Sequence, residues 1–196
     1  MNDFLSNNCD FTSLDEKIRE GCSFDCGNKD LNDFFLNNAI LYSAELLGKT
    51  YCFILHTDPS IIVGEFTVSN DSIRVEDLPN ARKKKINKEI PRPKQMKHYP
   101  AVLIGRFGVN VKYKKQHIGT EMMNFIKSWF LPSMNKTGCR YIVVDAYNES
   151  APLQFYQRND FEYLFSTEEQ EAQATDIEVN QLKTRFMYFD LIKMSE

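Results

Sequence analysis

The sequence predicts an α/β fold, in which helices flank a central sheet, within a single domain. Strand-like and helix-like segments alternate without interruption from Ala101 to Phe165. The chain has 196 residues, of which 42% are hydrophobic and 13% aromatic, so it can bury one sizeable core. The sequence contains no evident repeat or second domain, and we therefore expect one domain over residues 1–196.

The alternating region begins with a buried strand over residues 101–109. Two glycines in this apolar run, Gly105 and Gly108, leave room for another group to lie against the backbone. A helix over residues 120–131 follows, because apolar side chains recur with helical spacing at positions 122, 123, 126, 129 and 130. The strand and the helix are joined by a short loop that ends at a helix N-terminus.

This loop is cationic, since it carries Lys112, Lys114 and Lys115. A helix N-terminus offers unpaired N–H groups and the positive end of the helix dipole. Together with the lysines, these groups favour a phosphate or pyrophosphate as the ligand. A solvated turn is the other interpretation, because capping groups and surface charges are common where helices begin.

Three more elements complete the region. They are a buried strand over residues 140–147, a short helix over residues 152–158 and a strand over residues 161–165. The segment Asn148-Glu-Ser-Ala151 forms the turn between the first two. The region therefore reads as strand, loop, helix, strand, helix, strand.

The order of these elements resembles that of the GCN5-related N-acetyltransferases. In that family a pyrophosphate loop, commonly Gln/Arg-x-x-Gly-x-Gly/Ala, opens the helix, and Lys114-Lys-Gln-His-Ile-Gly119 takes its place here. A later family motif, Asn-x-x-Ala followed by Tyr and an aromatic residue, is matched by Asn148-Glu-Ser-Ala151, Tyr156 and Phe161. Two positions differ from the family pattern: Lys114 replaces Gln or Arg, and His117 replaces the first glycine, whose space its side chain would fill.

The resemblance implies a mixed, mostly antiparallel sheet of six to seven strands that splays between strands 101–109 and 140–147. Acetyl-coenzyme A, the acetyl donor, would lie between these two strands. Backbone groups of residues 107–109 would bind the pantetheine and the thioester carbonyl, and the loop would hold the pyrophosphate. The expected cofactor-binding residues are Phe107, Gly108, Val109, Lys114, Lys115, Gln116, His117, Ile118, Gly119, Thr120 and Asn148.

Tyr156 matches the tyrosine that the family commonly places near the sulfur as general acid. A phenol with a pKa of about 10 is protonated at neutral pH and can give its proton to the departing thiolate. An aromatic core residue on an amphipathic helix is the other interpretation. The main prediction is therefore an acetyl-coenzyme A-dependent N-acetyltransferase, in which a primary amine attacks the thioester directly.

A general base is not evident in the sequence. Glu65 lies inside an expected strand over residues 61–69, where alternation predicts an outward-facing side chain; the other interpretation is a base near the acceptor. A lysine side chain, with a pKa of about 10.4, would need a base, whereas an α-amine near 7.7–8.0 is already substantially neutral. An α-amino acceptor is therefore favoured, as on a peptide, an amino acid or an aminoacyl-tRNA.

A second interpretation is a toxin-like acetyltransferase that acts on the α-amine of aminoacyl-tRNA. The segment Phe24-Asp-Cys-Gly27, followed by Leu31-Asn32, resembles the start of the first helix in the family's toxin branch. The strand Leu103-x-Gly-Arg106 also suggests the toxin interpretation. We expect that first helix over residues 29–46, beside the acceptor site, and a short strand over residues 22–27 before it.

A basic segment supports an RNA acceptor. Residues 82–97 carry eight Lys or Arg and one Glu in a chain with a net charge of −3. Exposed helical turns are expected from Arg82 to Lys88, and an extended chain over residues 91–94. Such a run either contacts RNA phosphates or is a solvated surface.

The remaining chain carries weaker signals. Strands are expected over residues 50–56 and 185–192, and the family would make residues 166–181 the long connection of a final hairpin. The expected partners are a small-molecule or peptide amine, a tRNA, a second copy of the chain and, for a toxin, an antitoxin. A non-catalytic module that binds acyl-coenzyme A is the alternative outside the enzymes.

Composition argues against a metal and a membrane. The five cysteines, at positions 9, 22, 26, 52 and 139, lack paired zinc-site spacing, and no feature marks one as an activated nucleophile. No run approaches the roughly 20 apolar residues of a membrane span, and the N-terminus lacks the pattern of a signal peptide. We expect a cytoplasmic protein without a metal cofactor.

Overall fold

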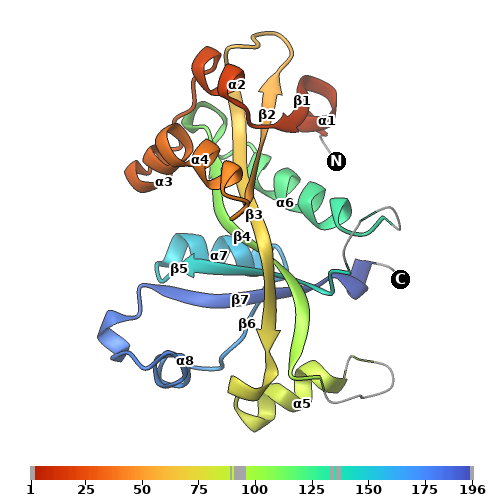
Figure 1. Cartoon of the computed structure of the whole chain (residues 1–196), viewed down its shortest axis with the longest axis vertical. Helices are drawn as coiled ribbons and strands as arrows, with labels where there is room; N and C mark the ends of the chain where they lie inside the picture. The colour runs from red at the N-terminus through yellow and green to blue at the C-terminus, as the bar shows by residue number, and fades with distance from the viewer. Residues whose placement is uncertain (1–2, 89, 91–95, 133–134, 136–137, 195–196) are drawn as a thin grey trace. The chain divides into compact units, whose positions relative to one another are not determined.

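The computed structural model describes residues 3–88, 90, 96–132, 135 and 138–194. Its strands form a seven-stranded sheet in the hydrogen-bonded order β1-β2-β3-β4-β5-β7-β6 (Figure 1). Antiparallel pairing joins β1 to β2, β2 to β3, β5 to β7 and β7 to β6, whereas β4 and β5 run parallel. The expected mixed, mostly antiparallel sheet with helices is therefore confirmed.

The chain divides into two compact units. The first comprises Met1–Ser69 and Ile104–Trp129, and the second comprises Asn70–Leu103 and Phe130–Glu196. Strands β3 and β4 each contribute residues to both units. The single domain over the whole chain stays a prediction.

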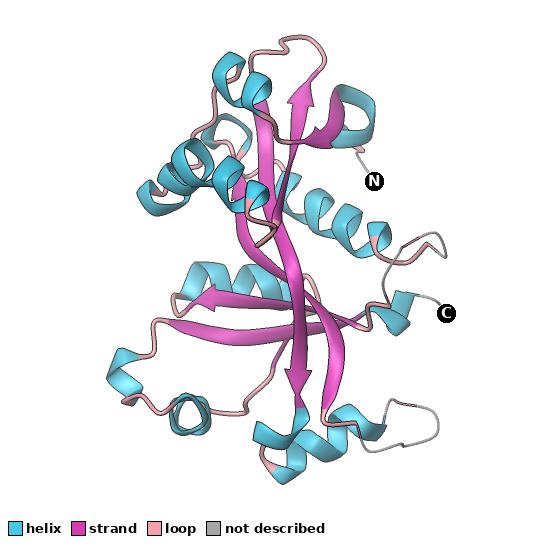
Figure 2. Ribbon diagram, viewed as in Figure 1, coloured by secondary structure: helices cyan, strands magenta, loops and turns pink. Residues whose placement is uncertain are grey.

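The first unit combines helices with strands of the sheet (Figure 2). Its elements, with the shared strands given in full, are α1 (Phe4–Asn8), β1 (Cys9–Ser13), α2 (Glu16–Gly21), α3 (Lys29–Asp33), η1 (Phe34–Asn38), α4 (Ala39–Ala44), β2 (Lys49–Leu55), β3 (Ile62–Arg74), β4 (His98–Val109), η3 (Val111–Tyr113) and α6 (Ile118–Trp129). Residues 1–20 are only weakly patterned in the sequence, yet α1, β1 and most of α2 form there. Strand β4 starts earlier than expected and includes Pro100.

The expected helix over residues 29–46 is present, but its middle is a π-helix. Asn28 caps it, since its Oδ1 accepts a hydrogen bond of 3.1 Å from the Leu31 N–H. From Phe34 to Asn38 the backbone winds in π geometry, and the Ala39 N–H donates to the Phe34 carbonyl five residues earlier. Phe35 and Ala39 are buried on this helix. π segments of one turn often occur at functional sites.

Strand β3 is covered on both of its faces within the first unit. On one face α6 packs closely, because a Cβ atom on Gly64 would lie 2.3 Å from the Met122 sulfur. Phe66, two residues along the same face, lies 6.1 Å from the Trp129 ring. The opposite face belongs to a cluster built around Leu14, Ala39, Cys52 and Ile62. Both faces of the strand are therefore buried.

The second unit carries the C-terminal half of the sheet. Its remaining elements are η2 (Val75–Asp77), α5 (Asn80–Lys88), β5 (Tyr141–Tyr147), α7 (Ser150–Arg158), β6 (Glu162–Tyr163), α8 (Glu168–Thr175), η4 (Val179–Gln181), β7 (Thr184–Asp190) and η5 (Leu191–Met194). Parallel pairing of β4 with β5 joins Ala101–Leu103 to Tyr141–Val143. A short parallel pairing of this kind agrees with the expected splay.

Two expectations in the second unit need correction. The strand expected over residues 161–165 is ordered as a strand only at Glu162–Tyr163. The connection expected over residues 166–181 contains a helix, α8, whose Glu171 is buried and forms a 2.7 Å ion pair with Arg185 of β7. The expected final hairpin is correct, since β6 pairs with β7.

The basic segment forms a helix, but it is not simply a solvated surface. Arg82 of α5 donates from Nε to the Leu164 carbonyl at 2.8 Å and from a second nitrogen to the Tyr163 carbonyl. Lys85 forms an ion pair with Glu162. The expected helical turns are thus confirmed, while the extended chain expected over residues 91–94 lies outside the described residues.

We expect Arg82→Ala to lower the free energy of unfolding by about 2–3 kcal/mol, because two partly buried carbonyls lose a charged donor. Lys84→Ala on the same helix is the matched control. Lys84 is exposed and has no hydrogen bond or ion pair among the described residues, so its loss should cost less than about 0.5 kcal/mol. Chemical denaturation measures both values, and equal effects would contradict this account of α5.

Candidate functional site

The cationic loop before α6 contains two residues in a backbone conformation that favours glycine. Lys115 and His117 both adopt the left-handed conformation, with φ of +61° and +62°. The side chains of Lys112, Lys114 and Lys115 are exposed, and α6 begins directly after the loop at Ile118. The first N–H groups of a helix lack partners within the helix. The loop therefore gathers lysines and backbone donors in one place.

His117 occupies the position where the family pattern has its first glycine. Its positive φ is the conformation that glycine adopts without strain. The backbone at this position therefore has a glycine-like conformation although the residue is histidine. Its carbonyl accepts the Glu121 N–H at 3.0 Å, which fixes the start of α6.

The segment Phe24–Gly27 packs beside this loop, but it is not the strand expected over residues 22–27. Ser23 makes a single bridge to Ile61, and the chain then turns. Asn32 of α3 holds the turn, since its Nδ2 donates to Asp25 at 2.7 Å and its Oδ1 accepts the Cys26 N–H at 2.9 Å. The Phe-Asp-Cys-Gly sequence and the later Leu-Asn pair are thus connected by hydrogen bonds.

Two hydrogen bonds connect the start of the loop to its surroundings. The Val111 N–H donates to the Asp25 carbonyl at 2.8 Å. Asn110, at the end of β4, donates from Nδ2 to the Ile62 carbonyl at 2.9 Å, so the loop leaves the sheet from a fixed point. The Phe24–Gly27 segment, the loop and the start of β3 therefore lie together in the first unit.

The two glycines of β4 have different surroundings. A Cβ atom at Gly105 would meet nothing within 4 Å, so space remains beside the backbone as expected. At Gly108 it would meet the Phe24 ring at 3.0 Å and the Phe35 ring at 3.3 Å. The expected room at Gly108 is therefore filled by aromatic side chains of the chain itself, which lie against the stretch expected to bind the thioester.

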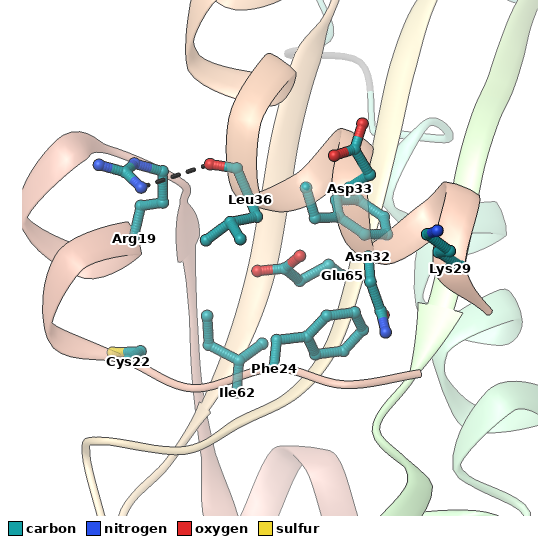
Figure 3. Close-up of a pocket in the computed structure, with 10 residues that line it drawn as sticks. Arg19, Cys22, Phe24, Lys29, Asn32, Asp33, Leu36, Ile62 and Glu65 are labelled. Carbon is teal, nitrogen blue, oxygen red and sulfur yellow. Dashed lines mark hydrogen bonds between the residues drawn. The ribbon is translucent and has the colours of Figure 1, made fainter. Parts of the chain in front are cut away.

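These aromatic rings also line a pocket in the first unit (Figure 3). Its volume is about 280 Å³. The lining residues are Arg19, Cys22, Phe24, Lys29, Asn32, Asp33, Phe35, Leu36, Ile62 and Glu65. They come from α2, the Phe24–Gly27 segment, α3, η1 and β3. The sequence pointed to Glu65 and the Phe24 segment, but no pattern marked Arg19 or Leu36.

Glu65 is the buried carboxylate of this pocket, and the outward-facing orientation predicted from alternation is wrong. Its residue exposure is 2%, and its Oε2 has no hydrogen-bond partner among the described residues. It points to the face opposite Gly64 and Phe66, which helix and pocket residues cover. Burial raises the pKa of Glu65 to about 8, because the charged form loses its hydration.

The other expected site residues, Asn148 and Tyr156, lie in the second unit. The Asn148 side chain donates to the Leu182 carbonyl at 3.2 Å, which anchors the turn after β5. Tyr156 is partly buried on α7, with its ring 5.4 Å from that of Phe161. Burial raises the pKa of its hydroxyl, and the Asp145 carboxylate raises it further, so the phenol stays protonated at neutral pH. Its role as general acid stays a prediction.

Solved structures similar to this chain cover nearly all of it. A tyrosine-to-phenylalanine variant of KacT matches with a TM-score of 0.73 and 15% identity, over 96% of this chain and 98% of the other. AtaT complexed with acetyl-methionyl-tRNAfMet matches with a TM-score of 0.68 and 20% identity, over 96% and 98%. A similar variant of the AtaT toxin was solved bound to the C-terminus of the antitoxin AtaR and to acetyl-coenzyme A. It matches with a TM-score of 0.60 and 16% identity, over 96% of this chain and 96% of the other.

No protein-family model matches the chain. The fold is that of the GCN5-related N-acetyltransferases. The resemblance drawn from the loop and the Asn148 motif is confirmed at the level of this fold, as is the likeness to its toxin-like branch. Within the acetyltransferase fold, the roles of the individual residues remain predictions.

The described part of the chain offers no other obvious chemistry. Among these residues no group of three or more His, Cys, Asp or Glu side chains could hold a metal ion. All five cysteines are free thiols, and burial raises the pKa of several of them, including Cys9 to about 11. No helix within the described ranges is both long and apolar enough to cross a membrane.

Glu65 should make the stability of the fold depend on pH. The group titrates near 4.5 in its ordinary state and near 8 when buried. Between these values the folded chain keeps a proton that the unfolded chain has released, so the free energy of unfolding falls as pH rises. The slope for one group is at most about 1.4 kcal/mol per pH unit.

Glu65→Gln removes this contribution, and its stability relative to the wild type should therefore increase from pH 5 to pH 8. Chemical denaturation of both proteins at the two pH values measures the change. Glu45→Gln, at an exposed site that follows α4, is the matched control. A difference between Glu65→Gln and wild type that does not change with pH would show that Glu65 is not a buried, protonated carboxyl group.

Proposed function

We propose that this chain is an acetyl-coenzyme A-dependent N-acetyltransferase whose acceptor is the α-amine of an aminoacyl-tRNA. The observation that carries the proposal is the likeness, over 96% of the chain, to AtaT solved with acetyl-methionyl-tRNAfMet. This acceptor was the second interpretation of the sequence, and the comparison favours it over a small-molecule or peptide amine. A second AtaT structure contains acetyl-coenzyme A, which supports the donor.

The loop before α6 would hold the donor's pyrophosphate. Its left-handed residues, the exposed lysines at 112, 114 and 115, and the N-terminus of α6 are the groups that bind phosphates in proteins. Backbone groups of Phe107, Gly108 and Val109 would bind the pantetheine and the thioester carbonyl. These hydrogen bonds would use main-chain atoms, so they would depend little on which side chains stand at these positions.

The reaction would proceed by direct attack of the α-amine on the thioester carbon. The new C–N bond forms as the C–S bond breaks, and Tyr156 would return a proton to the thiolate. Its raised pKa keeps the phenol protonated at neutral pH, although it also makes the phenol a weaker acid. Acetylation removes the free amine from the aminoacyl group, so that amine can no longer act as a nucleophile in peptide-bond formation.

Lysines on α5 are the candidate contacts for tRNA phosphates. Lys84 and Lys88 are exposed and have no hydrogen bond or ion pair among the described residues. Arg82 and Lys85, by contrast, are bound within the second unit. We therefore assign phosphate contact to Lys84 and Lys88 rather than to the whole basic run. An antitoxin-type partner follows from the likeness to AtaT as a further proposal, whereas a second copy of the chain stays a prediction from the sequence.

Acetyl transfer to charged tRNA tests the proposed function directly. Labelled acetyl-coenzyme A is incubated with total tRNA charged with each amino acid in turn, with deacylated tRNA, and with free amino acids, peptides and small amines. We expect label on charged tRNA alone, and a rate about 10²-fold or more lower for Tyr156→Phe. Label on free amines alone would contradict the tRNA acceptor.

The same assay tests whether the lysines of α5 contact tRNA. Replacing Lys84 and Lys88 together by Gln should lower the rate on charged tRNA and reduce its salt dependence, because phosphate contacts release counterions. Lys17 and Lys49, both exposed in the first unit, provide a matched double variant. Equal effects of the two double variants would remove α5 from the tRNA interface.

Lys114→Glu should weaken acetyl-coenzyme A binding by about 10–100-fold, since a charge-assisted contact to phosphate is replaced by repulsion. Isothermal titration calorimetry measures this affinity. Lys49→Glu makes the same charge change on an exposed strand residue away from the loop and should leave the affinity unchanged. Equal affinities for wild type and Lys114→Glu would remove this loop from the donor site.

A further inference from the structure

We propose that the pocket containing Glu65 receives the amine end of the acceptor, and that the Glu65 carboxylate takes the proton that the amine loses during attack. The inference rests on the proposed function and deepens it, because the sequence left a base at Glu65 as one of two interpretations and the comparisons do not assign a general base. It is argued from the position of Glu65, the walls of its pocket and the charges around it.

The first observation is an unpartnered carboxylate in an apolar pocket. Glu65 has 2% exposure, and its Oε2 is buried without a hydrogen bond among the described residues. Phe24, Leu36 and Ile62 surround it in Figure 3. Burying a carboxyl group in this way costs free energy that a hydrogen-bonding or cationic partner would recover. The pocket is therefore suited to a ligand that brings an amine.

The second observation is where the pocket lies. Phe24 and Phe35 line it, and the same two rings lie against Gly108 of β4. Residues 107–109 are the stretch proposed to bind the thioester. An amine at Glu65 would thus be next to the proposed position of the reacting carbonyl.

The third observation concerns size and polarity. A volume of about 280 Å³ is at the lower limit of small-molecule sites. It suits a group of the size of one amino-acid residue, and the aromatic and aliphatic walls suit an apolar side chain. The chemistry that the pocket recognises is therefore an amine carried on an apolar residue, as in an aminoacyl ester with an aliphatic or aromatic side chain.

Other ionisable groups face the pocket from each packed element. They are Arg19 of α2, Cys22, and Lys29 and Asp33 of α3. Cys52 of β2 does not line the pocket but pairs with Glu65 on the adjacent strand. Arg19 donates to the Leu36 carbonyl at 3.3 Å, and Asp33 accepts a hydrogen bond of 2.9 Å from Asn37. Burial, and not one of these charges, is what shifts the pKa of Glu65.

The proton balance of the step is simple. The neutral amine attacks the carbonyl carbon, the C–N bond forms, and one N–H proton moves to the ionised Glu65. The C–S bond breaks, and the thiolate is protonated by Tyr156. Solvent then removes the proton from Glu65 and restores the one on Tyr156. Both the amine and Glu65 must therefore be deprotonated before the reaction.

This requirement predicts a pH dependence of kcat/KM that would not be expected if Glu65 had only a structural role. At pH values below the pKa of both the amine and Glu65, log(kcat/KM) should rise with pH. The slope should be near two in the wild type and near one in Glu65→Gln. We would measure it from about pH 6 to about pH 7, where aminoacyl esters survive, with the charged tRNA on which the wild type is active. The variant should also be about 10²-fold slower or more.

Three controls separate the possible causes. Glu65→Asp keeps a carboxylate and should keep the slope near two at a reduced rate. Glu45→Gln, at an exposed position, should keep both rate and slope. Calorimetry should show unchanged acetyl-coenzyme A affinity for Glu65→Gln, which establishes an intact donor site.

Each outcome decides the matter. A slope near two in Glu65→Gln, or a wild-type rate, would overturn the role of Glu65 while leaving the proposed function in place. Wild-type activity on small amines but not on charged tRNA would overturn the proposed function, and the slope comparison would then be made on that amine. Absence of transfer to every acceptor would overturn both proposals.

Discussion

Burial of β3 on both of its faces is the constraint on which the first unit depends. Helix α6 approaches one face so closely that a Cβ atom at position 64 would force the Met122 side chain to move. The segment from α3 to α4 covers the other face. A polar residue on this strand cannot reach water simply by pointing outward. It must find a partner within the fold or remain without one.

Two neighbouring residues on the covered face show the two solutions. Thr67 is buried and shares a 2.7 Å hydrogen bond with the hydroxyl of Thr50 on β2. Glu65 is equally buried, and its Oε2 has no partner within the described residues. A fold that pairs one polar group and leaves the next unpaired has kept a local cost, and such costs are commonly retained where function requires them.

Sequence reasoning predicted the elements whose apolar residues recur with one clear helical or strand spacing. It failed where contacts with a distant segment determine the secondary structure. Helix α6 and strand β5 could be predicted, because their apolar residues already show which face is buried. Strand β1 could not, since Cys9 pairs with Leu55 far along the chain. Helix α8 was missed because its acidic composition indicates a solvated loop, whereas Arg185 neutralises the buried Glu171.

In the candidate site, too, local motifs could be predicted from the sequence, whereas features that depend on distant contacts could not. The loop lysines and Tyr156 belong to local motifs that a sequence displays. Alternation correctly placed Glu65 on the face opposite Phe66, but it cannot tell whether a helix covers that face. The basic residues of α5 are a similar case, because composition counts Arg82 as a surface charge while the fold uses it to hold two carbonyls.

The π-helical turn at Phe34–Asn38 has a consequence for how this protein can diversify. A π turn holds one residue more than the α turn that it replaces. Loss of that residue would restore regular α geometry and change which side chains within the turn face the pocket. Phe35 and Leu36, which line the pocket, lie within this turn. Single-residue insertions and deletions here would therefore exchange the pocket's wall while the sheet stays unchanged. If the pocket receives the acceptor as proposed, helix winding alone would give evolution a route to a new acceptor preference.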